Sequence, residues 1–139
     1  MHIDLRHILQ SLFLVIFLVL MASCNGAQGV ESRTIVQRQV VNDMTITLET
    51  AETLVVNQQA VFVVTVTDGQ GKPVPADVYL DLVMPAHPMG TNQPLAEPSA
   101  DGVYRTSSVF TMDGEWAVTV VATAQGRTNQ AIFHVMVLP

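Results

Sequence analysis

The sequence has a single cysteine, Cys24, among its 139 residues. No disulfide bond can therefore form within the chain, which excludes a disulfide-stabilised scaffold. Basic residues are also few: six lysines and arginines stand against twelve aspartates and glutamates, which gives a formal net charge of −6. This balance argues against nucleic-acid binding, because phosphate backbones are bound by basic surfaces. After the N-terminal segment, no stretch keeps a helical hydrophobic period beyond two turns, so we expect no helical domain.

Residues typical of catalytic sites are scarce as well. After the N-terminal segment only His87 and His134 remain as histidines, and no arrangement of serine, histidine and aspartate suggests a triad. The segment Gly69-Gln70-Gly71 has the composition of a hairpin turn rather than of a phosphate loop. Asp77 and Asp81, four apart on one strand face, read as part of a solvated face and not as a catalytic pair. We therefore expect that the protein is not an enzyme.

Residues 1–23 have the composition of an export signal. Arg6 precedes an almost continuous apolar run at residues 8–21, which is shorter than the roughly 20 residues of a membrane span and suits a signal peptide. The run Leu20-Met21-Ala22-Ser23-Cys24 resembles a bacterial lipobox. This resemblance implies cleavage before Cys24 and a lipid on its sulfur, and the alternative is an uncleaved anchor with an ordinary cysteine. Both interpretations place residues 25–139 outside the cytoplasm, held at the cell membrane or the outer membrane.

Residues 24–42 are expected to comprise the lipidated cysteine and a flexible tether, because glycine, serine, glutamine and asparagine recur there with little periodicity. An alternative is a first strand at Thr34–Val41, since that stretch also contains several β-branched residues. From residue 43 to residue 139 we expect one folded domain.

The domain at residues 43–139 is expected to be all-β, because its short segments alternate between apolar and polar residues. Turns rich in glycine, aspartate and proline separate them. The pattern predicts an immunoglobulin-like antiparallel β-sandwich of about seven strands, although the cysteine–tryptophan–cysteine arrangement of true immunoglobulin domains is absent. The expected strands are 44–49, with a continuation at 53–56, then 59–67, 77–84, 102–110, 115–123 and 128–137.

The segment Met84-Pro85-Ala86-His87-Pro88-Met89-Gly90 follows one of these strands. Its prolines exclude a helix and the interior of a sheet, so it is predicted to be a stiff exposed loop. Loops held on a rigid sheet often carry function. Thioethers select Cu(I), and imidazole suits copper in either oxidation state, so this loop is a candidate copper site.

Three short motifs lie between Leu80 and Ala122: Met84-Pro85 with His87 and Met89, Gly102-Val103-Tyr104, and Met112-Asp113-Gly114-Glu115-Trp116. Through these motifs the stretch resembles the YtkA-like domain family, small exported β-sandwiches with FixH-like relatives. The resemblance implies copper binding for copper handling or for the assembly of copper-containing oxidases. The implied partners are another copper protein, or an oxidase or transporter in the membrane. In this chain a histidine replaces one thioether typical of the family loop, and the second methionine lies further along.

The candidate ligands converge only if the proline loop continues into a short extra strand near residues 92–96. In that case the strand at 102–110 runs parallel to the strand at 77–84, and Met112 ends near Met84. His134 and Met136 would finish at the same end. We therefore predict Met84, His87, Met89 and Met112 as copper ligands, with His134 and Met136 as further candidates.

Each candidate also has a structural interpretation. Met84 and Met112 have the parity of core residues, and methionine commonly fills gaps at the ends of sandwiches. His134 fits a strand surface, and Trp116 is expected in the core. The competing functional hypothesis is an interaction module that docks on a membrane partner and binds no metal.

Overall fold

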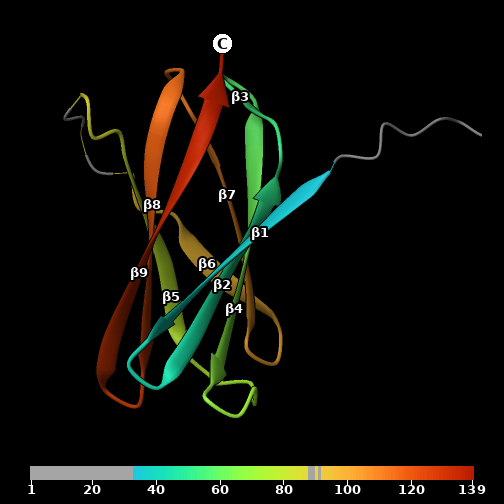
Figure 1. The fold of residues 1–139 in the computed structure, drawn as a ribbon, viewed down its shortest axis with the longest axis vertical. Coiled ribbons are helices and arrows are strands. Elements are labelled where there is room, and N and C mark those ends of the chain that lie inside the picture. The colour runs from blue at the N-terminus through green and yellow to red at the C-terminus, as the bar shows by residue number, and fades with distance from the viewer. Residues whose placement is uncertain (1–32, 88–89, 91) are drawn as a thin grey trace, which may run out of the picture. The chain divides into compact units, whose positions relative to one another are not determined.

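The computed structural model describes residues 33–87, 90 and 92–139. These residues form nine strands and no helix, so the all-β prediction is confirmed and no described helix is long and apolar enough to cross a membrane (Figure 1). The predicted export signal and Cys24 lie outside the described residues. The strands are β1 (Thr34–Val41), β2 (Met44–Ala51), β3 (Leu54–Val55), β4 (Gln59–Asp68), β5 (Asp77–Val83), β6 (Leu95–Ala100), β7 (Val103–Val109), β8 (Gly114–Ala124) and β9 (Arg127–Leu138).

The strands follow one another in the order β1-β2-β4-β7-β6-β5-β8-β9-β3. Strand β6 pairs with both β5 and β7, so the sheet curls at β6 into two facing layers with the core between them. The described domain thus has nine strands rather than about seven. It is also not purely antiparallel, because β3 pairs in parallel with β9 at Leu54 opposite Val137.

Strand β1 occupies part of the segment that we predicted to be a tether. It pairs with β2 along its whole length, from Thr34 opposite Ala51 to Val41 opposite Met44. The alternative of a first strand at Thr34–Val41 is therefore the one found, and the domain begins before Asp43. The tether prediction was wrong here because β2 supplies backbone hydrogen bonds to a strand that is polar in composition.

Alternate side chains of the strands fill the core, and three of them form an aromatic column. Phe62 and Phe110 have ring centroids 6.1 Å apart at an interplanar angle of 80°, and Phe110 and Trp116 are 5.0 Å apart at 61°. These are edge-to-face arrangements, which aromatic rings prefer. All three rings are buried, so the column fixes the β7–β8 corner to the core.

Strands β1 and β9 lie side by side, although they stand near opposite ends of the strand order, and amide side chains join them. Gln37 Nε2 donates to the carbonyl of His134 at 3.0 Å, and Gln39 Nε2 donates to the carbonyl of Ile132. At the end of β1, Asn42 Nδ2 donates to Asn129 Oδ1 at 2.6 Å. Side-chain amides thus occupy acceptors of β9 that an open strand edge would leave to water or to another chain.

The antiparallel run of the strands defines two ends of the domain. The loop pole, uppermost in Figure 1, carries the start of β1, the end of β9, the loop after Val83 and the corner between β7 and β8. The opposite pole carries the turns after β1, β4, β6 and β8.

Replacing Gln37 and Gln39 together by valine should loosen β1, because two side-chain hydrogen bonds from β1 to β9 are lost. We expect faster amide hydrogen exchange across β1 and a loss of about 1–2 kcal/mol in the free energy of unfolding. Arg38→Gln on the exposed face of the same strand is the control. Unchanged exchange in the double variant would mean that these amides do not hold β1 in place.

Gly102→Ala should destabilise the domain more than Gly126→Ala. Both glycines have positive φ, 68° and 75°, so both alanines carry a backbone cost of roughly 1–2 kcal/mol. A Cβ at Gly102 would also lie 2.8 Å from the carbonyl oxygen of Val66 and 2.9 Å from Cβ of Pro73, whereas nothing lies within 4 Å at Gly126. Urea unfolding of both variants measures the difference, and equal losses would show that close approach is unimportant at Gly102.

Candidate metal centre

The strand that follows the proline loop decides where the candidate ligands lie. It is β6, at Leu95–Ala100, and the residues before it already bond to β5: Leu82 N–H donates to Asn92 O and Leu80 N–H to Pro94 O, both at 3.0 Å. The predicted extra strand is thus present, slightly later in the chain. Because the chain reverses at β6 and again before β7, β5 and β7 run in the same direction. Both strands therefore end at the loop pole.

Met84 follows the last residue of β5 and points into the core, where it is 5% exposed. Its methyl group lies over Gly114: a Cβ at that glycine would come within 2.7 Å of Met84 Cε. Gly114 also has a φ of 118°, a conformation that side chains rarely adopt. The absence of a side chain at Gly114 therefore makes room for the thioether, and Met84 fulfils the structural interpretation of a core residue.

Met112 lies in the corner between β7 and β8, two residues before Gly114. It is partly buried and packs against the core. Trp116 Nε1 donates to the carbonyl oxygen of Met112 at 3.1 Å, which holds this part of the corner in place. The structure thus brings Met84 and Met112 to the same end of the domain, as the topological prediction required.

His87 is exposed, and its backbone N–H donates to the carbonyl of Met84 at 3.1 Å. This hydrogen bond closes a tight turn from Met84 to His87. The histidine is thereby held next to the residue that carries the buried thioether. Met89, the remaining loop candidate, lies outside the described residues. Within residues 33–87, 90 and 92–139, no three His, Cys, Asp or Glu side chains are grouped to hold a metal ion.

His134 and Met136 end near the loop pole but on the outer face of their layer. The inward residues of β9 are the odd-numbered ones, such as Phe133 and Val135, which are 1% and 4% exposed. Met136 is 56% exposed. Met84 points to the inner face, whereas His134 and Met136 point outward. These two residues therefore lie near the predicted end of the domain, but their side chains do not converge with Met84.

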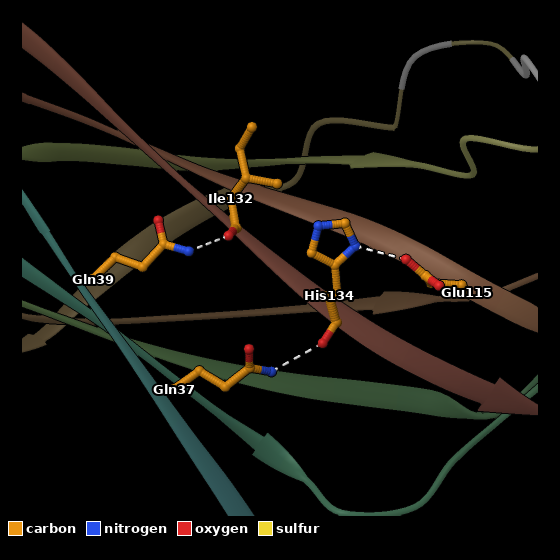
Figure 2. A network of polar contacts seen from close by, with 5 residues as sticks. All are labelled: Gln37, Gln39, Glu115, Ile132 and His134. Carbon is orange, nitrogen blue, oxygen red and sulfur yellow. Dashed lines mark hydrogen bonds and ion pairs between the residues drawn. The ribbon is translucent and has the colours of Figure 1, made fainter.

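The ring of His134 is held by a residue that sequence reasoning missed. Its Nδ1 lies 2.8 Å from Oε1 of Glu115 on the neighbouring strand, and the side chains are 59% and 58% exposed. Figure 2 shows Glu115 beside the imidazole ring of His134 and Gln37 at the backbone carbonyl of His134. In the β8–β9 hairpin Ala117 lies opposite His134 and Glu115 lies opposite Met136. The contact between Glu115 and His134 can be predicted only when this register is known.

Asp77 and Asp81 lie opposite different residues of β8, Thr123 and Thr119. Asp77 is exposed, whereas Oδ1 of Asp81 is buried and has no hydrogen-bond partner among the residues that the structure describes. Asp81 is therefore less solvated than we predicted. The two carboxylates do not converge on a common point.

The Glu115–His134 pair should contribute little to stability, because solvent screens exposed ion pairs. A double-mutant cycle with Glu115→Gln and His134→Gln should give a coupling free energy below about 1 kcal/mol in thermal unfolding. A larger coupling would indicate that the pair is structural, and it would make the outer face of β9 more rigid than its exposure suggests.

Comparisons with known proteins agree with this architecture. The model of the YtkA-like family matches residues 38–121, more than half of the chain. A solved DUF4426 family protein from Pseudomonas aeruginosa PAO1 is 16% identical, with a TM-score of 0.55 over 75% of this chain and 95% of that one. The soluble domain of PmoD from Methylocystis sp. ATCC 49242 (Rockwell) is also 16% identical, with a TM-score of 0.48 over 73% and 96%. No curated protein matches the chain significantly. The first structural likeness supports the all-β fold.

Proposed function

The chain belongs to the YtkA-like family, and from this premise we propose that it is an exported, membrane-tethered domain that binds copper at the loop pole. One observation carries the proposal: the topology brings the thioether-bearing residues Met84 and Met112 to one pole, beside the exposed loop histidine His87. The bound ion would be Cu(I), which thioethers select. Outside the cytoplasm thioethers also avoid the disulfide chemistry of thiols.

The burial of these ligands supports exchangeable binding rather than permanent storage. Met84 is buried and Met112 is partly buried, so their sulfurs are held by packing. His87 is exposed, and an exposed ligand can be replaced by a ligand of another protein. A site with fixed ligands on one side and a free ligand on the other suits the transfer of an ion.

The anchor in this proposal is a lipid on Cys24, which would keep the domain outside the cytoplasm at a membrane surface. The role would be copper handling or oxidase assembly, with a copper protein or a membrane oxidase or transporter as partner. The domain would bind and deliver the ion and would not catalyse a reaction.

A second candidate function is an interaction module without metal. It is favoured by the exposed apolar side chains near the loop pole, among them Val83 at 41% and Leu138 at 47%. In this function the loop would bind a protein surface, and Met84 and Met112 would serve only packing.

A Cu(I) competition titration tests the first function. The full chain carrying Cys24→Ser, which removes the lone thiol, is titrated in detergent micelles against a chromophoric Cu(I) chelator. We expect stoichiometric binding that weakens about tenfold or more, at least 1.4 kcal/mol, in Met112→Leu and His87→Ala. Met84→Leu should behave likewise while changing stability by less than about 1.5 kcal/mol, because the volume is conserved.

Met136→Leu is the matched control, since it removes a more exposed thioether on the outer face. It should bind copper like the parent chain. Equal affinity in all variants would contradict the proposed site, and no binding by the parent chain would leave the interaction module as the function.

A further inference from the structure

The described chain enters the domain at the loop pole. Thr34 lies opposite Ala51 at the end of β2, and the carbonyl of Arg33 accepts a hydrogen bond from Glu52 N–H at 2.7 Å. Strand β9 ends at the same pole, where Val56 N–H donates to Leu138 O at 2.9 Å. A membrane anchor upstream of residue 33 would therefore be connected to the end of the domain that carries the candidate copper ligands.

The length of the upstream segment limits how the domain can be oriented. Ten residue steps separate Cys24 from Thr34, and a chain covers at most about 3.6 Å per residue, or roughly 36 Å in all. The eight residues of β1 place Thr34 roughly 27 Å from the opposite pole, whereas a ten-residue chain without regular structure has a root-mean-square length of only about 17 Å. A lipid on Cys24 therefore favours the loop pole at the bilayer, because contact of the opposite pole with the bilayer would require the segment before Thr34 to be strongly extended.

Exposed apolar side chains gather around the loop pole. Three of them end strands that finish there, one lies two residues before the end of such a strand, and two lie at the third position of strands that start there. Nine large hydrophobic residues of the described chain are exposed, and six belong to this group, which we call the collar. The collar comprises Val36, Val61, Val83, Val109, Met136 and Leu138.

The two poles differ in the signs of their charged residues. The opposite pole has charges of both signs on its turns, and a cavity of about 620 Å³ there is lined by Asp68, Lys72 and Asp101 among others, as suits a solvated surface. The charged residues described near the loop pole are basic at Arg33 and acidic at Glu49, Glu52, Asp113 and Glu115, so this pole is acidic on balance. An acidic pole is repelled by anionic headgroups, so the collar is poorly suited to a bilayer surface.

We propose that the loop pole faces the membrane and that the collar docks on the extramembrane surface of an integral membrane protein in the same bilayer. The proposal deepens the proposed function and rests on it, because it takes the anchor at Cys24 from there. The partner surface is apolar where it meets the collar and neutral or basic at its margin, opposite Glu52 and Glu115. Such a ring of apolar contacts excludes water around the loop, so His87 would meet the partner's ligands in a sheltered space.

Thiol labelling of the lipidated full chain tests this arrangement. The native cysteine is the only one in the sequence, so lipidation leaves an introduced cysteine as the only free thiol. Val83→Cys reports on the collar, and Lys72→Cys reports on the opposite pole. Each variant, expressed from its own promoter, is treated with a membrane-impermeant maleimide in host membranes and in vesicles of phosphatidylethanolamine and phosphatidylglycerol.

We expect the cysteine at position 83 to react roughly fivefold or more slowly in host membranes than in the lipid vesicles, because interface cores exclude solvent. The cysteine at position 72 should react at equal rates in both. Equal rates at position 83 would overturn the docking surface. Slow labelling of position 83 already in the vesicles would make the bilayer the occupant and would also overturn it, as would equal slowing at both positions.

Intact mass separates this proposal from the proposed function. A chain without lipid on Cys24 would overturn the anchor, and the orientation with it. A lipidated chain that binds Cu(I) but labels equally at position 83 would overturn the docking surface alone.

Discussion

Strand β6 belongs to both layers of the domain, and the arrangement of the loop pole depends on it. Its first residues pair with β5, at Tyr79 opposite Leu95, and its later residues pair with β7, at Glu97 opposite Arg105. The register shifts between Pro98 and Ala100, as expected where proline removes a ladder donor. Without this short strand β7 would run opposite to β5, and the corner bearing the second candidate thioether would move to the far end of the domain.

At the loop pole the same side chain, Met84, fills the core and is a candidate metal ligand. Met84 fills the core, and Gly114 leaves the space that its methyl group needs. Ligands that are fixed by packing lose little freedom on binding an ion, which favours a defined geometry. The loop histidine His87 has the opposite property, since it is exposed. The pole therefore combines a rigid side with an exposed and adaptable side.

The sequence predicted the elements whose inward residues are apolar. Alternation located most of the strands, and Trp116 was correctly expected in the core. Strand β1 was assigned to a tether because its inward positions include Gln37 and Gln39, whose partners are carbonyls of β9 nearly a hundred residues away. No local pattern shows such partners. The resemblance to the YtkA-like family, stated from short motifs, agreed with the family match over residues 38–121.

The sequence predicted at which end of the domain the candidate residues lie, but we did not predict correctly which way all of their side chains point. Counting strand reversals correctly brought Met84 and Met112 to one pole once β6 existed. The alternation of β9 already implied that His134 faces away from Phe133 and Val135, so nearness to the pole was an insufficient criterion for a common site. The Glu115 contact depended on the exact pairing of β8 with β9, and a sequence pattern alone leaves hairpin register undetermined when the loop type is unknown.

The position of Trp116 gives the protein an optical reporter of its own. It is the only tryptophan in the sequence, its indole N–H is bonded to the backbone of Met112, and its ring stands 5.0 Å from that of Phe110. Indole emission depends on the polarity and hydrogen bonding around the ring. Events at the β7–β8 corner will therefore change the intrinsic fluorescence of the unlabelled chain, while events at the opposite pole will leave it unchanged.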